Sequence, residues 1–203
     1  VDLDAVIPGT GPLEVDIGFG RGLSVFTRAE VAPESRILGI EIKSKWSTKV
    51  AERIQKKGLS DRVVIWAADA REVLSRCGPT SSVQRVFVHF PDPWWKKRHT
   101  KRRVVGDALL DALAVLMPAG GALYVQTDVA SPPALYPTTL AAHPSFEVVD
   151  SNLPDNPPGC VSDPQVRAPD DGLPASRTLS PRLGSACCPL PCTPPSPTSA
   201  CPR

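Results

Sequence analysis

Short apolar runs alternate with amphipathic stretches along the chain up to Asp150. Alternating or continuous apolar positions predict strands, and apolar positions spaced three and four apart predict helices between them. The predicted strands cover residues 13–17, 36–41, 62–68, 83–90, 122–127 and 146–149, and the predicted helices cover residues 23–32, 44–57, 70–76, 105–117 and 132–142. Strands and helices that alternate at this spacing indicate βαβ units. We therefore expect an α/β fold with a mostly parallel sheet, helices on both faces, and ligands bound at the carboxyl ends of the strands.

The composition changes after Asp150. Residues 154–182 are rich in Pro and Asp, and residues 183–203 contain mainly Pro, Ser, Thr and Cys with no acid. Such segments cannot bury enough apolar surface to fold alone. We expect residues 1–150 to form the core of the domain, residues 151–182 to form a divergent C-terminal closing segment of it, and residues 183–203 to be a disordered tail.

The net charge of +2 hides an uneven distribution. Residues 43–57 and 96–103 together hold 12 of the 23 Lys and Arg residues but only one of the 21 acids, Glu52, and the rest of the chain is acidic. Basic charge concentrated in this way indicates a localised contact with a polyanion. The alternative, a solvated helix face, remains open for residues 43–57; it fits residues 96–103 less well, because Trp94, Trp95 and prolines adjoin that charge.

Other features of the sequence bear on the cellular location of the protein. The longest apolar run, residues 108–117, contains Asp111 and is too short to cross a bilayer, and no secretory leader opens the chain. Cys77 is the only cysteine before Gly159, which fits a reducing compartment. We therefore expect a cytoplasmic protein that does not bind membranes, as a monomer or homodimer. No metal is expected, because the tail cysteines form no CxxC pair and have no nearby His.

Five acids lie at or just past the ends of predicted strands. They are Asp16, Glu41, Asp69, Asp92 and Asp128. One such acid alone is usually a helix cap or a solvated loop residue. Five at one edge of a sheet indicate a ligand site, because that edge is where such folds bind ligands.

The glycine turn after the first strand limits which class of ligand the site could bind. Gly18, Gly20 and Gly22 lack the third-glycine spacing of the dinucleotide fingerprint, and Asp16 just before them would repel a pyrophosphate. A nucleotide-dependent oxidoreductase is therefore a weak alternative. A nucleoside with a cationic amino-acid tail fits better, with Glu41 accepting hydrogen bonds from ribose hydroxyls and Asp69 from an adenine amino group. These residues indicate S-adenosylmethionine.

Several motifs together resemble one enzyme family. They are LEVDIGFGRG at residues 13–22, LGIE at 38–41, Asp69-Ala70, FPDPW at 90–94 with Lys96 and RHTKRR at 98–103, and Thr127-Asp128. This set is similar to that of the TrmB family of tRNA (guanine-N7)-methyltransferases, over about residues 2–150. The resemblance implies the class I S-adenosylmethionine-dependent methyltransferase fold, a Rossmann-like sheet of seven strands. It also implies methyl transfer to N7 of the guanine at position 46, in the variable loop of tRNA.

The resemblance also implies roles for individual residues. The methyl donor would be bound by Asp16, Gly18, Gly20, Gly22, Glu41, Asp69 and Asp92. The guanine would be faced by Lys96, Asp128, Ser162 and Gln165. The tRNA backbone would be bound by Arg98, His99, Thr100, Lys101, Arg102 and Arg103. Because N7 already holds an in-plane lone pair, the catalytic role of Asp92 is to orient the guanine through its N1–H and amine, not to remove a proton. His89 is expected to be a packed core residue.

Two positions depart from the family pattern. Asp16 stands where the family more often has Glu, so the carboxylate keeps its charge but has a shorter reach. Residues Ser162 to Gln165 stand where the family carries Thr-x-x-Glu, so Gln165 keeps hydrogen bonding but lacks the charge. The alternative function is therefore a catalytically weakened relative that binds tRNA without efficient methylation.

Overall fold

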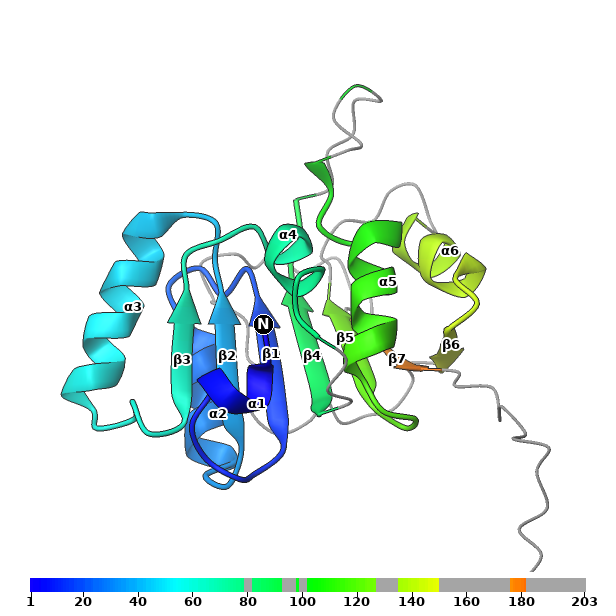
Figure 1. The fold of residues 1–203 in the computed structure, drawn as a ribbon. Coiled ribbons are helices and arrows are strands. Elements are labelled where there is room, and N and C mark those ends of the chain that lie inside the picture. The colour runs from blue at the N-terminus through cyan, green and yellow to red at the C-terminus, as the bar shows by residue number, and fades with distance from the viewer. Residues whose placement is uncertain (79–81, 93–97, 99–101, 127–134, 150–175, 182–203) are drawn as a thin grey trace, which may run out of the picture.

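Seven strands form one sheet in the order β3-β2-β1-β4-β5-β7-β6 (Figure 1). The computed structural model describes residues 1–78, 82–92, 98, 102–126, 135–149 and 176–181. The strands are β1 Leu13–Ile17, β2 Arg36–Ile40, β3 Val63–Trp66, β4 Val83–His89, β5 Ala122–Gln126, β6 Phe146–Val149 and β7 Ser176–Pro181. β1 to β5 pair in parallel, whereas β7 is antiparallel to β5 and β6. The predicted α/β class and six predicted strands are confirmed; the local pattern did not predict β7.

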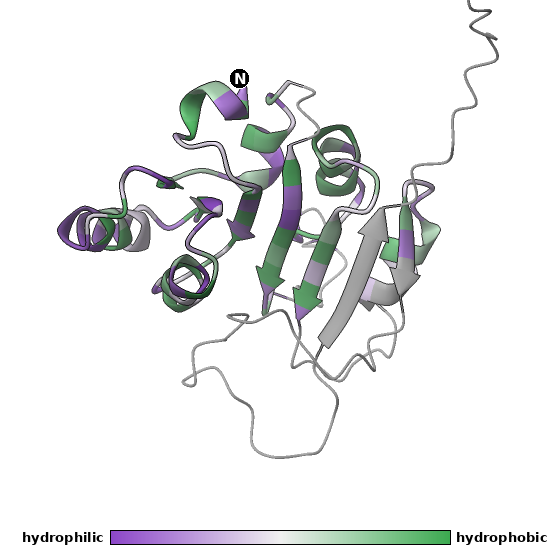
Figure 2. Ribbon diagram, turned by 90° about the horizontal axis from the view of Figure 1, so that it is seen from below, coloured by the Kyte–Doolittle hydropathy of each residue, from purple (hydrophilic) through white to green (hydrophobic). Residues whose placement is uncertain are grey.

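Helices cover both faces of this sheet (Figure 2). They are α1 Leu3–Val6, α2 Leu23–Val31, α3 Ser44–Lys56, α4 Ala70–Leu74, α5 Asp107–Leu116 and α6 Leu135–Ala142. α5 begins two residues later than predicted, because Gly106 is extended and caps the helix. The sequence did not predict α1, a single turn whose start is capped by the Asp2 side chain. No helix in the described part of the chain is long and apolar enough to cross a membrane.

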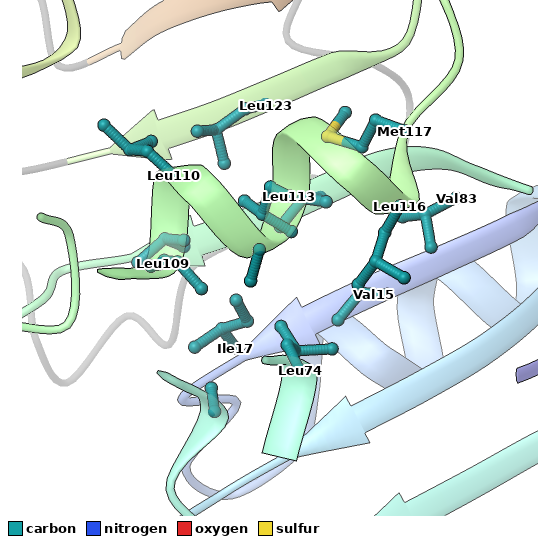
Figure 3. Packing of buried hydrophobic residues seen from close by; sticks show 14 of the residues in the cluster. Val15, Ile17, Leu74, Val83, Leu109, Leu110, Leu113, Leu116, Met117 and Leu123 are labelled. Carbon is teal, nitrogen blue, oxygen red and sulfur yellow. The ribbon is translucent and has the colours of Figure 1, made fainter. Parts of the chain in front are cut away.

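The larger apolar core lies between the sheet and helices α4, α5 and α6. Figure 3 shows four leucines of α5 packing toward β1, β4 and β5: Leu109, Leu110, Leu113 and Leu116. All four are fully buried. Their spacing places an apolar stripe on one side of α5, which fixes this helix on the sheet and so orders the carboxyl ends of β4 and β5.

The smaller core lies under α2 and α3. It joins Val25 and Phe26 of α2 to Val50 and Ile54 of α3. Gly39 of β2 makes this packing possible, because a Cβ there would lie 2.6 Å from the Cδ1 atom of Ile65. Glycine at this position therefore leaves room for the Ile65 and Phe19 side chains, which belong to this core.

A buried ion pair joins β1 to α2 and was not predicted. Glu14 is 1% exposed, and its carboxylate accepts hydrogen bonds from Nε of Arg28 at 2.8 Å and from Nη2 at 2.6 Å. Ser35 and Arg85 donate to the same carboxylate at 3.1 and 2.9 Å. Such an arrangement satisfies a charge that would otherwise be costly to bury.

Candidate functional site

The glycine turn after β1 leaves open space beside its backbone. Gly18, Gly20 and Gly22 have φ angles of 75°, 55° and 84°, a region that favours glycine. A Cβ at Gly18 or Gly20 would meet nothing within 4 Å, whereas a Cβ at Gly22 would lie 2.8 Å from Val50. Gly22 is therefore required for packing on α3. Gly18 and Gly20 instead leave room for a ligand to approach the main chain closely.

Asp16 lies beside this turn with one unsatisfied oxygen. The side chain is buried, and its Oδ2 accepts a hydrogen bond from the Ser24 hydroxyl at the start of α2. Its Oδ1 has no hydrogen-bond partner in the part of the chain that the structure describes. Burial raises the pKa of Asp16, while His89 and the Ser24 hydrogen bond act in the opposite direction. An unpaired buried carboxylate oxygen favours a cationic donor, such as an ammonium group.

Glu41 connects the end of β2 to the glycine turn. Its Oε2 accepts from the Gly20 N–H at 3.0 Å, and its Oε1 accepts from the Lys43 N–H at 2.8 Å. A carboxylate offers about four acceptor positions, so two remain for hydroxyl donors. The Ser47 hydroxyl also donates to the Glu41 carbonyl at 3.0 Å, which fixes the chain at the start of α3.

Asp69 is held by Arg71. Asp69 caps α4, and its Oδ1 accepts from the N–H and Nε of Arg71, both at 3.0 Å. Its Oδ2 accepts from Nη2 of Arg71 at 2.6 Å. These side-chain hydrogen bonds from Arg71 are the main reason that the pKa of Asp69 is lowered. Three of about four acceptor positions are thus used, and one on Oδ2 remains for a ligand amine.

The turn after β4 has a strained backbone. Phe90 has a φ of 47°, the only positive value among the described residues other than glycine. Its N–H donates to the Gln126 carbonyl at 2.8 Å, and the Tyr136 hydroxyl of α6 donates to the Pro91 carbonyl at 3.3 Å. These contacts hold a conformation that a bulky residue rarely adopts, and they present Asp92 to solvent.

Tyr136 joins this turn to the basic segment. Burial raises the pKa of its hydroxyl, with a further rise from Asp92 and an opposing effect from Arg103. Arg71 also donates from Nη1 to the Arg103 carbonyl at 3.4 Å. The segment after β4 is therefore tied both to α6 and to the residue that holds Asp69.

The structure brings most of the predicted methyl donor residues together at the carboxyl edge of β1, β2 and β3: Asp16, Gly18, Gly20, Gly22, Glu41 and Asp69. Asp92 lies just past the end of β4, the strand next to β1. Arg98 and Arg102 are exposed, and Arg103 is half-buried. The remaining predicted site residues lie outside the described residues: Lys96, His99, Thr100, Lys101, Asp128, Ser162 and Gln165.

Sequence reasoning missed the contributions of three residues to the site: His89, Arg71 and Tyr136. His89 is largely buried and stacked on Phe87, as a core histidine would be, yet its Nδ1 lies 3.9 Å from Oδ1 of Asp16. The Nδ1 atom and Oε1 of Gln126 are the other buried polar atoms without a partner in the described part of the chain. Tyr136 gave no local signal, because it contacts Pro91 from a distant position in the chain. Arg71 bonds both to Asp69, two residues away, and to the distant Arg103 carbonyl, and neither contact was predicted.

The arrangement fits a nucleoside that carries a cationic amino-acid tail. The open glycine backbone admits the ligand, and the unpaired oxygen of Asp16 suits a positive group. Glu41 and Asp69 keep acceptor positions for hydroxyl and amino donors. S-adenosylmethionine has all three kinds of donor, so the residues present fit this methyl donor.

Comparison with known proteins agrees with this arrangement. Residues 10–166 match the family described as "Putative methyltransferase". The chain is 36% identical to a tRNA (guanine-N(7)-)-methyltransferase of Synechococcus elongatus over 83% of this chain and 80% of that protein. It is 39% identical to the enzyme of the same name from Microcystis aeruginosa over 68% of this chain and 66% of that protein.

The fold is also similar to solved structures. A SAM-dependent O-methyltransferase from Thermotoga maritima superposes with a TM-score of 0.52 at 21% identity, over 85% of this chain and 60% of that protein. At this identity the similarity concerns the fold alone. It confirms the predicted class I methyltransferase architecture.

Proposed function

This chain belongs to the tRNA (guanine-N7-)-methyltransferase family, and on that premise we propose that it methylates N7 of a guanine in tRNA. The family relation covers the strands and turns that form the site. The methyl donor is S-adenosylmethionine, which supplies an electrophilic methyl group on a sulfonium sulfur when bound. We place the target at position 46 in the variable loop, and the protein in the cytoplasm as a monomer or homodimer.

The methyl donor is held at the carboxyl edge of β1, β2 and β3. Asp16 offers its unpaired Oδ1 to the ammonium group, and Glu41 offers its remaining acceptor positions to the ribose hydroxyls. Asp69 offers one position to the adenine amine. Gly18 and Gly20 let the ligand lie against the backbone, since a side chain at either position would fill that space.

Asp92 orients the guanine. Because N7 holds an in-plane lone pair, no group of the protein has to remove a proton before methyl transfer. The rate then depends on alignment of N7 with the methyl group, and an exposed acceptor on a rigid turn can provide it. The strained Phe90 and the bond from Tyr136 to Pro91 hold that turn. Lys96, Asp128, Ser162 and Gln165 are proposed to complete the guanine pocket.

The basic segment after Asp92 binds the tRNA backbone. Residues 98–103 contain Arg98, His99, Thr100, Lys101, Arg102 and Arg103. Their position directly after the residue that orients the base places phosphate contacts beside the target. Such contacts give affinity that falls steeply as salt concentration rises.

One observation of the structure carries this proposal within the family. A buried carboxylate oxygen of Asp16 that has no partner among the described residues lies beside a glycine turn with open space. A nucleoside with a cationic tail needs both features in its binding site. The decisive experiment incubates the protein with tRNA and S-adenosylmethionine and measures 7-methylguanosine by mass spectrometry. We expect methylation at one position; absence of 7-methylguanosine together with retained tRNA binding would instead favour the weakened relative.

A further inference from the structure

A second basic surface lies on α3, away from the segment that follows β4. We define the α3 basic surface as Arg21, Lys45, Lys49, Arg53 and Lys57. All five side chains are exposed. At the left of Figure 2, the outer side of α3 is largely hydrophilic, while Val50 and Ile54 on its inner side are buried. The inner side is therefore already used by the core, and the outer side faces solvent.

Aromatic rings hold these cations close together. The cationic groups of Arg21, Lys45 and Lys49 lie 5.4, 5.9 and 5.7 Å from the centre of the Trp46 ring. Those of Arg53 and Lys57 lie 4.2 and 5.9 Å from the centre of the Phe26 ring. Contacts of this kind favour a cation at each position. They also restrict long side chains that would otherwise spread apart by charge repulsion.

The lysines of this surface have no acidic partner in the described part of the chain. Neither Lys45, Lys49 nor Lys57 forms an ion pair there. In contrast, several arginines elsewhere in the fold form ion pairs with acids: Arg28, Arg36, Arg71, Arg76 and Arg85. The charges of these three lysines are therefore not neutralised by an ion pair within the described fold, which suits a surface for an external anion.

The α3 basic surface is continuous with the rim of the methyl donor site. Arg21 follows Gly20 of the glycine turn, and its carbonyl accepts a hydrogen bond from Nη1 of Arg53 at 3.0 Å. α3 itself begins three residues after Glu41. The end of β2, which leads into α3, is two strands from the end of β4, or roughly 10 Å. One extended polyanion can thus cross the site and contact both basic regions.

The spacing of the cations suits a repeated charge. Three of the cations follow one another at intervals of four residues: Lys45, Lys49 and Arg53. Their Cα atoms are therefore spaced about 6 Å apart along the helix axis. A row of this kind follows a charged backbone better than it surrounds a single small anion. We propose that the α3 basic surface binds the phosphate backbone of the tRNA substrate at a region beyond the one held by residues 98–103. This inference rests on the proposed tRNA substrate.

The test neutralises three lysines whose side chains form no hydrogen bond in the described structure. The variant Lys45→Gln/Lys49→Gln/Lys57→Gln is compared with the wild type in filter-binding titrations with tRNA at several salt concentrations. We expect about a tenfold or greater loss of affinity and a salt-dependence slope lower by about three, one for each phosphate contact. The KM for tRNA should rise while kcat stays unchanged, because the contacts are remote from the chemistry.

Three controls make the result specific. Lys45→Arg/Lys49→Arg/Lys57→Arg keeps the charge and should bind tRNA as the wild type does. Arg76→Gln removes one exposed cation at the far end of α4 and should change affinity less than Lys49→Gln does. Calorimetric titration with S-adenosylhomocysteine should give the same affinity for the triple Gln variant and the wild type, which shows that the fold and the glycine turn are intact.

The outcomes separate this inference from the proposed function. If the wild type methylates tRNA and the triple Gln variant keeps the wild-type affinity and slope, the α3 basic surface does not bind tRNA. Loss of binding to phosphatidylserine vesicles with unchanged tRNA binding would also overturn the inference and assign the surface to a membrane. If the wild type itself neither binds nor methylates tRNA, the proposed function fails instead.

Discussion

Oδ1 of Asp16 and Nδ1 of His89 lie 3.9 Å apart, and neither atom has a hydrogen-bond partner among the described residues. The distance is too long for a hydrogen bond but short enough for the charges to interact. The two residues come from adjacent strands, β1 and β4, at the carboxyl edge where the methyl donor is proposed to bind. The unpartnered oxygen of Asp16 therefore faces the place where the ligand ammonium group is proposed to bind.

Cofactor affinity is predicted to fall as the pH falls. Burial raises the pKa of Asp16, so the protonated form becomes populated at a higher pH than for an exposed Asp. A ligand ammonium favours the carboxylate, and binding should therefore release protons through that pH range. Calorimetry with S-adenosylhomocysteine in buffers of different ionisation enthalpy measures this release. His89, Glu41 and Glu14 also interact with Asp16, and the same measurement on His89→Asn is the control.

Asp16→Asn is predicted to weaken the binding of S-adenosylhomocysteine and to abolish the pH dependence of that binding. Loss of one charged hydrogen bond corresponds to roughly 10- to 100-fold weaker binding. The ligand-free variant should be more stable than the wild type above the raised pKa, because it no longer buries an ionised carboxylate. Thermal unfolding checks this second effect. Unchanged affinity would contradict the assigned role of Asp16.

Asp92→Ala is predicted to reduce methylation at least about 100-fold while leaving tRNA binding largely intact. The residue orients the guanine, whereas the phosphate contacts that dominate affinity lie in other residues. Single-turnover formation of 7-methylguanosine measures the first effect, and filter binding the second. Retained turnover in Asp92→Ala would show that another group orients the base.

Phe90→Gly is predicted to lower methylation about tenfold or more without a comparable loss of stability. Glycine adopts a positive φ readily, which relieves about 1–3 kcal/mol of strain, but it also loosens the turn that carries Asp92. The strain relief partly offsets the lost contacts of a half-buried ring. Phe90→Asn is the matched control, since Asn tolerates this conformation and keeps a Cβ. Full turnover in Phe90→Gly would mean that this turn need not be rigid.

Arg28→Met is predicted to destabilise the fold by about 3 kcal/mol, because it removes the main partner of a buried carboxylate. Arg85 contacts the same oxygen of Glu14, but its side chain is 40% exposed. Arg85→Met should therefore cost less than about 1 kcal/mol. Urea unfolding of the two variants compares the two contacts directly. Equal losses would contradict the difference in burial as the cause.

Gln165→Glu is predicted to raise the rate of methylation. The substitution restores the acid that the family carries in its closing loop, and a carboxylate there can accept hydrogen bonds from the guanine. Steady-state kinetics with tRNA measure the change, with Gln165→Ala as the control. If neither substitution alters the rate, residues 160–180 do not reach the site.

The sequence alone determined the elements and the residue types of the site. Apolar periodicity is a local property, so six strands and the length of α3 could be predicted from it. The acids that follow successive strands could also be placed at one edge, because the carboxyl ends of parallel strands meet there. The glycine turn at residues 18–22 could be predicted as well, because it depends on residues that are neighbours in the sequence.

The tertiary structure alone decided how these residues are partnered. β7 contains one large apolar residue, Leu179, so no local pattern predicted it; antiparallel pairing with β5 and β6 fixes it in the sheet. The approach of His89 to Asp16 follows from the register of β1 and β4, and the bond from Arg71 to the Arg103 carbonyl follows from the packing of α4 near the segment before α5. Burial and pairing depend on which distant segments fold together, and it is they that leave Asp16 with an oxygen for a ligand.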